Sequence, residues 1–500
     1  MKFVVSGNGH EEFQSKILPQ LKSLLKVPSA INIDYQQKQL TNQYYDTSDN
    51  YFAEQRFGFR VRGCNNQFEQ TLKTQGTTTG GLHQRGEYNI EIPTNTPDLT
   101  LFEGVDWPEG RKSEALNRDI HQRFATNFVR DEYTLAFDDQ ELEIVFDNGA
   151  VIADSDSVPI REIEIELKTG DPKHVFSIAR LLNEHLTLRL SDTTKAAAGY
   201  MLIGESLIQK RKLPKYLPLN ENCSTEDAFC LAVECAISHW QYHEQAYMQT
   251  HALKYLDMML QGLQLLLQSV ALFLPVLQCA ELLTLHRQLI SYVQHWNWLN
   301  ELHNIRYLRS KRGPFSKQLN HHDALMSYLQ GRKIGLLQGR GPDELFFDSG
   351  ANEIKILTSE ILLNRPWRSV VTGADKPVLE HARGWLSQSW QNVLQSLSQS
   401  EKLSHTHYIA TENVLRQALT NGFILAELFA DNRGNFRAPW LDIMVGVEEL
   451  KALITLQQLL NVAEFNEDPE LKSWTADKIS NLLHVIERTR KVAIRLDAYW

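Results

Sequence analysis

Charged and apolar side chains alternate along several segments of the first 205 residues. In a β-strand, residues two apart share a face, so this alternation gathers the charges on one side of each strand. Arg60 and Arg62 share such a face, as do Glu69, Thr71 and Lys73. The same pattern covers Arg85, Glu87, Asn89 and Glu91, then Glu141 and Glu143, and then Glu162, Glu164, Glu166 and Lys168. Arginine forks suit phosphate oxygens, and clustered carboxylates suit hard cations such as Mg²⁺.

Two arrangements explain this alternation, and periodicity does not separate them. In the first, each charged face is the solvated side of a half-buried antiparallel strand, which is the commoner case for any single strand. In the second, the sheet closes with its charged faces inward, so that cations surround a polyanion and carboxylates hold metal. Charged residues are depleted in strands, yet here they form runs of both signs, which weakens the first arrangement for the set of strands as a whole. A charged interior is costly without a ligand, so closure predicts a site for phosphate and metal.

The elements that must position these residues change in character near residue 215. Before it, short alternating segments separated by turn signals predict an antiparallel sheet that is closed or nearly closed. The expected strands are 2–6, 39–46, 58–63, 67–75, 86–92, 131–137, 141–147 and 161–169, with helices at 12–25 and 172–186. From about residue 220, apolar residues recur every three or four positions, which predicts helices.

A basic segment with two prolines, residues 210–218, joins the two parts. Polar, proline-bearing connectors are typical of domain boundaries. We therefore expect an α+β chain with a strand-rich domain at 1–205, a linker at 206–219 and an all-α domain at 220–500. In the helical part, His239 and His243 stand one turn apart and have metal-binding spacing, but the flanking Trp240 and Tyr242 favour a packing role.

Composition excludes several classes of protein. The chain has 500 residues, 42% hydrophobic and 22% charged, as in folded multidomain proteins. The net charge of −10 argues against a duplex nucleic-acid partner. The longest apolar run, 270–277, is too short to span a bilayer, and the first residues do not read as a signal peptide. The 5 cysteines lack the spacing of a zinc site or a disulfide framework, so we expect a cytoplasmic protein with no membrane partner.

Common catalytic motifs do not account for the charges. The Gly80-Gly81 segment lacks the Gly-Lys-Ser/Thr ending of a phosphate-binding loop, so a hairpin turn is the better interpretation. No pattern for a Ser-His-Asp or Cys-His nucleophile is visible.

Taken together, the alternating segments resemble the CYTH domain of the triphosphate tunnel metalloenzymes. The resemblance lies in residues 42–47 (NQYYDT), 58–62 (GFRVR), 68–73 (FEQTLK), 80–89 (GGLHQRGEYN), 128–132 (FVRDE), 162–167 (EIEIEL) and 194–200 (TKAAAGY). The segment at 80–85 is similar to bacterial inorganic triphosphatases that carry a second, CHAD domain. The resemblance covers essentially residues 1–205, and for the helical part it is much weaker.

This resemblance implies an N-terminal eight-stranded antiparallel β-tunnel that hydrolyses inorganic triphosphate with Mg²⁺ or Mn²⁺, followed by a CHAD-like helical bundle. By position, it implies catalytic roles for Lys2 and Lys73 and phosphate binding by Arg60, Arg62, Arg85, Arg130 and Lys195. It also implies metal binding by Glu164, Glu166 and Glu143, with Glu69, Thr71, Glu87 and Glu162 as further tunnel residues. Ala198 stands where the family usually has arginine, so one phosphate contact is expected to be missing.

The family's first motif, Glu-x-Glu-x-Lys, is matched here only by Lys2, and its two glutamates would precede Met1. Two explanations stay open: a start upstream of Met1, or the loss of two metal-binding carboxylates. We favour the first because most other tunnel residues are present. A chain extended by Glu-x-Glu-x is then expected to release phosphate from triphosphate faster than the chain that starts at Met1.

Other functions are also compatible with the sequence. The chain would be a non-catalytic polyphosphate-binding scaffold if its tunnel held metal poorly, or a tunnel enzyme acting on thiamine triphosphate or a nucleotide. In the helical part, the basic residues Arg306, Arg309, Lys311, Arg312 and Lys317 are the expected polyphosphate contact. Basic residues also suit solvated helix ends, which is the commoner explanation for such a group.

Overall fold

The computed structural model describes residues 1–25, 31–79, 82–84, 86–204, 210–397, 402–429, 432–461 and 468–500. The chain folds into two compact units. Unit 1 comprises Met1–Lys210, Gln241–Ala252 and Glu344–Asn364, and unit 2 comprises Arg211–Trp240, Leu253–Asp343 and Arg365–Trp500. Two helical segments therefore share a compact unit with the first 210 residues. The functional division at residues 206–219 stays a prediction.

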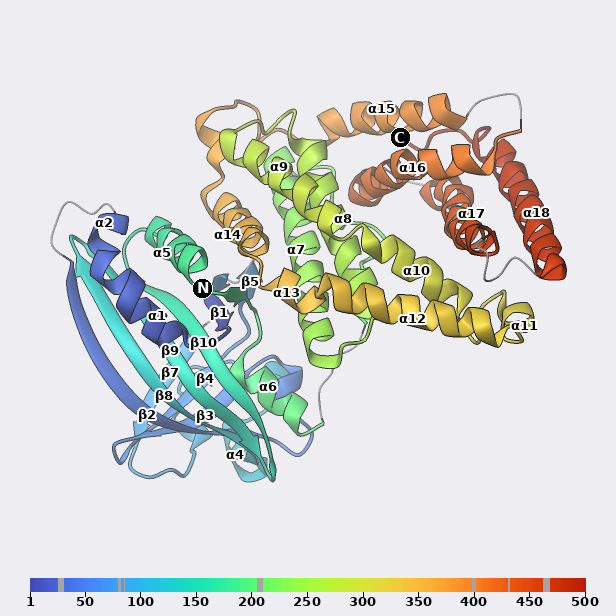
Figure 1. Ribbon diagram of the computed structural model, residues 1–500. Helices are drawn as coiled ribbons and strands as arrows, with labels where there is room; N and C mark the ends of the chain where they lie inside the picture. The colour runs from blue at the N-terminus through green and yellow to red at the C-terminus, as the bar shows by residue number, and fades with distance from the viewer. Residues whose placement is uncertain are drawn as a thin grey trace. The chain divides into compact units, whose positions relative to one another are not determined.

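Unit 1 is built on one antiparallel sheet, which has nine strands in the described residues (Figure 1). Their order across the sheet is β11 (Leu188–Leu190), β1 (Lys2–Val5), β10 (Asp156–Thr169), β9 (Gln140–Ala153), β8 (His121–Phe137), β2 (Asn32–Asp46), β3 (Gly58–Cys64), β4 (Gln67–Lys73) and β7 (Glu87–Ile92). β5 (Thr77–Thr79) and β6 (Leu82–Gln84) form a separate two-stranded antiparallel sheet. The expected antiparallel sheet is confirmed, with one strand more than expected, because the three-residue β11 is too short to show alternation and forms by pairing with β1.

The strand register places the alternating charges on one face of this sheet. Residues directly opposite each other on neighbouring strands share a face. Glu162 lies opposite Asp147, Asp147 opposite Arg130, and Arg130 opposite Lys38. Farther along the sheet, Arg62 lies opposite both Asn42 and Glu69. One continuous charged face therefore runs from β10 to β4.

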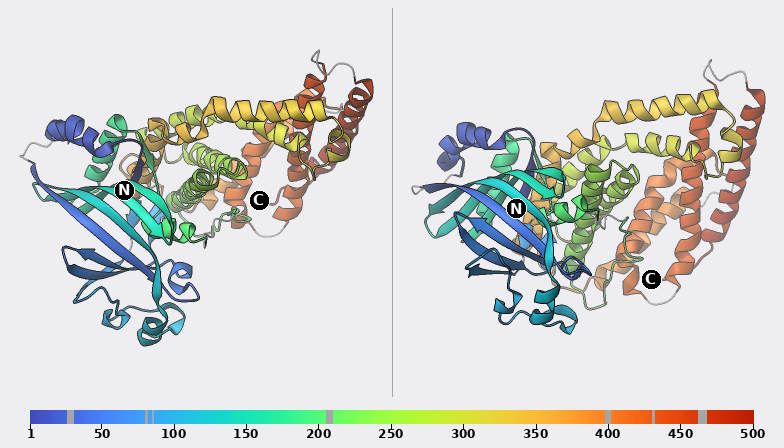
Figure 2. Two further views of the ribbon diagram at one scale, coloured as in Figure 1. Left: turned by 60° about the horizontal axis from the view of Figure 1, so that its bottom comes forward. Right: turned by 90° about the horizontal axis from the view of Figure 1, so that it is seen from below.

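The charged face is the inner side of a curled sheet. β2, β8, β9 and β10 have 14 to 17 residues each, and long strands coil as they twist. In a flat sheet, the five strand spacings from β10 to β4 would separate their side chains by roughly 24 Å. Glu164 on β10 nevertheless acts on the pKa of Lys73 on β4, which requires the two strands to face each other. Both views in Figure 2 show the long strands bending round in this way.

The other face of the sheet is covered by apolar packing. Phe3, Ile144 and Ile163 lie in one core cluster with Phe13 and with Phe176 of α5 (Lys173–His185). Phe13 begins a helical segment, Phe13–Ile17, that follows α1 (Gly9–Glu12). Burial of this face fixes the strand register, since a slip of one residue would exchange apolar and charged sides.

A short helix, α6 (Lys195–Leu202), packs on the inner side of the sheet. Its Ala196 and Ala198 contact a core cluster that contains Phe124 and Phe128 of β8. A Cβ atom on Gly199 would come within 2.1 Å of the Phe124 ring, so the close approach of α6 to β8 requires glycine there. The Thr194 side chain accepts a hydrogen bond from the backbone amide of Ala197 and caps the helix, which therefore begins at Lys195.

The described residues after 210 are mostly helical, as expected. The longer helices are α7 (Thr225–Thr250), α8 (Lys254–Phe273), α9 (Ala280–His295), α10 (Trp298–Leu308), α12 (Asp323–Arg340), α14 (Ser349–Asn364), α15 (Leu379–Leu397), α16 (His405–Leu425), α17 (Arg433–Leu459) and α18 (Pro469–Ala493). Of these, α14 and the last turns of α7 belong to unit 1. His239 and His243 of α7 are both buried, which favours their packing role.

One helix in the described part of the chain, α8, is long and apolar enough to cross a membrane by length and composition. Its most apolar stretch has a mean hydropathy of 1.3 and is 61% buried inside the protein. A buried core helix of a soluble protein passes the same test, so this is weak evidence for a membrane span.

Candidate functional site

Three carboxylates meet on the inner face of the sheet, where β9 and β10 pair. Asp147 lies directly opposite Glu162, and Glu164 is the next inward residue of β10. One ligand oxygen from each lies within 4.8 Å of the others, the one group of this kind that the described residues contain. Asp147 is fully buried, whereas Glu162 and Glu164 keep 13% and 22% of their side-chain surface exposed.

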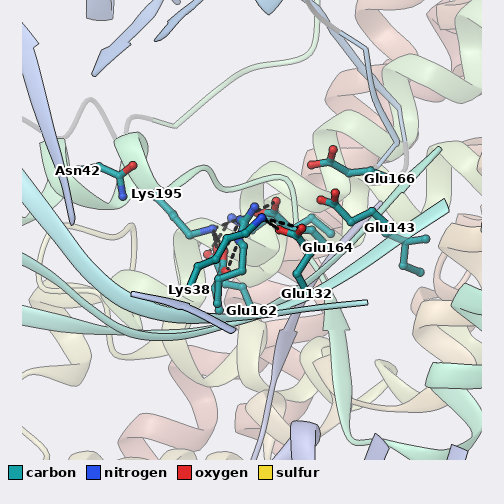
Figure 3. Close-up of polar contacts among 12 residues, drawn as sticks. Lys38, Asn42, Glu132, Glu143, Glu162, Glu164, Glu166 and Lys195 are labelled. Atoms are coloured by element: carbon teal, nitrogen blue, oxygen red, sulfur yellow. Dashed lines mark hydrogen bonds and ion pairs between the residues drawn. The ribbon is translucent and has the colours of Figure 1, made fainter. Parts of the chain in front are cut away.

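The ammonium group of Lys195 lies among these carboxylates (Figure 3). Its Nζ is 2.7 Å from Asp147, 2.7 Å from Glu162 and 3.0 Å from Glu164. Burial alone would lower the pKa of Lys195, but the charges of Glu162, Glu164 and Asp147 outweigh it and raise this pKa well above its ordinary value. Lys195 is therefore firmly protonated, and the first residue of α6 supplies a fixed positive charge.

Two further cations complete this group. Arg130 binds Asp147 through both arms of its guanidinium, with Nε and Nη2 each 2.8 Å from a carboxylate oxygen. The Nζ of Lys2 is 2.7 Å from Glu162 and donates to the carbonyl oxygen of Thr193 at 2.5 Å. Burial would raise the pKa of Glu164, but Lys195, Lys2 and Arg130 hold it well below its usual range. Three carboxylates thus face three cations, a set that we call the balanced cluster: Asp147, Glu162, Glu164, Lys2, Arg130 and Lys195.

A second group of charges, on β3 and β4, has an excess of cations. Burial, together with the charges of Arg60 and Arg130, lowers the pKa of Arg62 to about 10. Burial and Arg60 also lower the pKa of Lys73, although its ion pair with Glu87, at 2.8 Å, opposes this shift. We call Arg60, Arg62 and Lys73 the cationic cluster.

The cationic cluster also contains an unmet hydrogen-bond donor. The Nε of Arg60 is buried and has no hydrogen-bond partner among the described residues. Its Nη2 lies 3.9 Å from the carboxylate of Glu87, which is too far for a hydrogen bond. Buried polar groups are rarely left unpaired, so the donor and the mutual repulsion of the cations both point to an anion bound here.

Glu143 and Glu166 form a separate pair of carboxylates. They lie opposite each other on β9 and β10, and Lys168 is 3.4 Å from Glu143 and 2.8 Å from Glu166. Figure 3 shows the two side by side, away from the contacts that Lys195 makes. Burial raises the pKa of Glu143, and Lys168 opposes this effect.

The structure thus distributes the expected site residues over several places. Lys2, Arg130, Lys195, Glu162 and Glu164 meet in the balanced cluster; Arg60, Arg62, Lys73 and Glu87 meet on β3, β4 and β7; Glu143 and Glu166 stand apart from both. Glu69 and Thr71 lie on the inner face opposite Arg62 and Arg60. Arg85 and the Gly80-Gly81 turn lie outside the described residues. The individual roles of these residues stay predictions.

Sequence reasoning missed Asp147, the most deeply buried carboxylate of the balanced cluster. Its signal was present, because the alternation that begins with Glu141 and Glu143 reaches Asp147 two steps later, after the apolar Val145. It also missed the inward pair formed by Lys38 and Glu132, whose charged atoms are 2.7 Å apart.

Asn42 is a further inward residue that received no role from the sequence. It donates to the hydroxyl of Thr126 at 2.9 Å and accepts from the Nε of Arg62 at 2.8 Å. This hydrogen bond holds the guanidinium of Arg62 toward the inner face.

The donor set of the balanced cluster fits a divalent metal ion. Mg²⁺ and Mn²⁺ prefer oxygen ligands, and Asp147, Glu162 and Glu164 offer only carboxylate oxygens at close range. The ammonium of Lys195 lies between the same oxygens, so a divalent ion there would compete with Lys195 for them. Glu143 and Glu166 provide additional carboxylates on the same two strands.

Comparison with known proteins agrees with this geometry. A model of the CYTH domain family matches residues 15–200. An inorganic triphosphatase of Haemophilus influenzae (strain ATCC 51907 / DSM 11121 / KW20 / Rd) is 33% identical over 175 residues, which are 34% of this chain and 47% of the relative. The chain therefore matches about half the length of that curated relative.

Among solved structures, a putative adenylyl cyclase from Hippeastrum, described as having a dominant triphosphatase activity, is similar over 40% of this chain and 93% of its own, with 17% identity and a TM-score of 0.29. The CHAD domain from the plant Ricinus communis is similar over 58% of this chain and 99% of its own, with 12% identity and a TM-score of 0.39. The family match confirms the resemblance drawn from the strand motifs. Residues 15–200 of this chain form a CYTH domain.

Proposed function

We propose that the chain hydrolyses inorganic triphosphate to diphosphate and phosphate with the help of Mg²⁺ or Mn²⁺. The observation that carries the proposal is the cationic cluster, which lies on the same inner face as a compact group of carboxylates. The pKa values of Arg62 and Lys73 are lowered there, and the buried Nε of Arg60 has no partner among the described residues. A chain of phosphates meets both needs, because its oxygens accept from the arginines while metal on the carboxylates offsets its charge. The similarity to an inorganic triphosphatase supports this choice of substrate.

In this mechanism, the chain's own residues chiefly bind and orient the substrate. Arg60 and Arg62 would bind phosphate oxygens with their planar forks, and Lys73 would add a third positive charge. Asp147, Glu162 and Glu164 would hold the metal ion, which supplies neutralisation of the charge that develops as phosphate is transferred to water. Lys195, protonated throughout, would contribute a further positive charge toward the phosphate oxygens.

Phosphate release from tripolyphosphate, with and without Mg²⁺ or Mn²⁺, tests the proposal. Thiamine triphosphate, ATP and long-chain polyphosphate under the same conditions separate a triphosphatase from a tunnel enzyme with another substrate. We expect metal-dependent release that is fastest with tripolyphosphate. Release that is faster with thiamine triphosphate or ATP would reassign the substrate, and no release from any compound would reject the enzymatic function.

A non-catalytic polyphosphate binder is the second candidate, and the balanced cluster favours it. Lys2, Arg130 and Lys195 already neutralise its carboxylates, so any metal must compete with them. This candidate predicts tight tripolyphosphate binding by calorimetry together with no phosphate release in any metal.

Polyphosphate binding by the helical part is a separate proposal. In the basic group expected there, Arg306 is paired with Asp257 at 2.6 Å, whereas Lys311 and Arg312 are exposed. Binding of long-chain polyphosphate should therefore weaken in a Lys311→Ala/Arg312→Ala variant. Unchanged binding would remove this group as the contact.

A further inference from the structure

One edge strand of the nine-stranded sheet, β11, is hydrogen bonded by a single side chain from the helical region. β11 is the edge strand, and the backbone amide and carbonyl groups of its first and last residues point away from β1. The amide of Leu190 donates to Oδ1 of Asn352 at 2.8 Å, and Nδ2 of Asn352 donates to the carbonyl of Leu188 at 2.7 Å. The fully buried carboxamide of Asn352 thus replaces one residue of a further strand.

Asn352 is itself held firmly on α14. The second hydrogen of Nδ2 is donated to Oδ1 of Asn183 at 3.0 Å. Asn183 in turn donates to the carbonyl oxygen of Ser349 at 2.8 Å. The carboxamide therefore uses both its donors and its acceptor, which fixes its orientation. Asn352→Asp would keep an acceptor for Leu190 but would turn a carboxylate oxygen toward the carbonyl of Leu188.

A buried ion group fixes the same strand from another side. Lys355 of α14 lies 2.7 Å from Glu244 of α7, and Arg189 of β11 lies 3.6 Å from the same carboxylate. Arg189 also donates to the side chain of Gln245 at 2.8 Å. All of these residues belong to unit 1, and the charged side chains are no more than 5% exposed. Two helical segments thus hold β11 by directed polar contacts.

β11 leads directly into the balanced cluster. The amide of Ser191 donates to the carbonyl of Lys2 at 3.1 Å, and the carbonyl of Thr193 accepts from the ammonium of Lys2. Thr194 then caps α6, and Lys195 follows as its first residue. The chain therefore runs five residues from the hydrogen bond with Asn352 to the ammonium group that lies among the carboxylates.

We propose that Asn352 is a positioning residue that sets the places of Lys195 and Lys2 through β11. The helical region then has a role in the triphosphate site without touching substrate: α14 and the end of α7 complete the edge of the tunnel. The effect of Asn352 on substrate, though not its effect on β11, rests on the function proposed above. α14 has other anchors, since Arg180 of α5 pairs with Glu353 and Glu360 and Ile356 lies in the sheet core, so loss of Asn352 leaves the helix attached.

Hydrogen exchange in the full chain tests the positioning itself. In Asn352→Ala and Asn352→Asp, the amides of residues 188–195 should exchange at least tenfold faster than in the unmodified chain. Glu360→Gln is the matched control, because it removes an ion pair of the same helix that does not contact β11. Unchanged exchange at 188–195 in both Asn352 variants, or an equal increase in Glu360→Gln, would overturn the proposal.

Calorimetric binding of tripolyphosphate without divalent metal tests the link to substrate. We expect Asn352→Ala to weaken binding about tenfold and Glu360→Gln to change it less than twofold. In a Lys195→Gln background, the effect of Asn352→Ala should shrink to about twofold, because coupled residues are non-additive. An undiminished effect in that background would show that Asn352 does not act through Lys195. If the unmodified chain binds no triphosphate, the proposed function fails while hydrogen exchange still decides the positioning.

Discussion

The two charged clusters of the inner face differ in how far the protein satisfies its own charges. In the balanced cluster, three carboxylates and three cations pair at distances of 2.7–3.0 Å, and the pKa values of Glu164 and Lys195 both move toward the charged forms. In the cationic cluster, the pKa values of Arg62 and Lys73 move toward the neutral forms, and a buried donor of Arg60 has no partner among the described residues. In a balanced buried group the ions compensate one another, and removal of one partner is strongly destabilising, whereas an unbalanced group leaves charge that a ligand can neutralise. The comparison therefore separates the part of the site that is complete from the part that needs substrate.

The largest difference between the two clusters is expected when Asp147 is replaced. Its side chain is fully buried and holds both Arg130 and Lys195, so Asp147→Asn leaves two buried cations with too few anions. We expect the free energy of unfolding to fall by about 3–5 kcal/mol, as for other broken buried ion pairs, measured by urea denaturation.

Glu166→Gln is the control for this prediction. It removes a carboxylate that is 44% exposed on the same inner face, so a loss below about 1 kcal/mol is expected. Equal losses in the two variants would mean that the balanced cluster has no special role in folding.

Removal of Arg60 should have the opposite effect: activity should fall while stability is kept. The buried Nε of Arg60 has no hydrogen-bond partner among the described residues, so Arg60→Ala should leave stability nearly unchanged. We expect kcat/KM for tripolyphosphate to fall by roughly 100-fold, as for a lost charge-assisted contact to the transferred group. Arg60→Lys should recover part of the activity, because it keeps the charge and loses the fork.

Arg161→Ala provides the matched comparison, because Arg161 is an exposed arginine on the opposite face of β10. It should change neither stability nor activity. An Arg60→Ala variant that is as active as Arg161→Ala would remove the cationic cluster from the phosphate site.

Most of the inward charged residues could be predicted from the sequence, but their division into two clusters could not. The period-two alternation identified Arg60, Arg62, Glu162 and Glu164 as residues of shared faces, because the side-chain period of a strand is local. Which strands pair, and in which register, depends on contacts distant in sequence. Only the register, which sets Asp147 opposite both Glu162 and Arg130, brings this residue into the balanced cluster.

The contact between the helical region and β11 could not be predicted from the sequence. β11 has three residues, and Asn352 contacts it across more than 160 positions of the chain. No local sequence pattern shows that an asparagine will be buried against the backbone of an edge strand, since the same residue type is common on exposed helix surfaces. Such contacts emerge only when the whole unit is assembled.

Metal binding tests whether the balanced cluster is closed to cations in the free protein. The ammonium of Lys195 lies among the oxygens that would bind the metal, so Lys195→Gln should tighten Mn²⁺ binding about tenfold in the absence of triphosphate. Free Mn²⁺ measured by electron paramagnetic resonance gives this affinity without any turnover. Lys168→Gln, which removes the cation beside Glu143 and Glu166, is the companion variant. A larger gain in Lys168→Gln would place the metal at that carboxylate pair instead.

The smallest expected effect is a change in the titration of Lys73. Burial and Arg60 lower the pKa of Lys73 in the folded protein, so the unfolded chain binds this proton more tightly. Stability therefore rises with pH as the solution approaches the ordinary lysine pKa near 10.4. A bound polyanion brings negative charge to the cationic cluster and should raise the pKa of Lys73, which ¹³C-labelled lysine resonances can follow with and without tripolyphosphate. The resonance of Lys195, whose pKa is already raised by three carboxylates, should respond less. A larger pKa shift at Lys195 than at Lys73 would mean that the anion binds at the balanced cluster. The cationic cluster would then not be the part of the site that needs substrate.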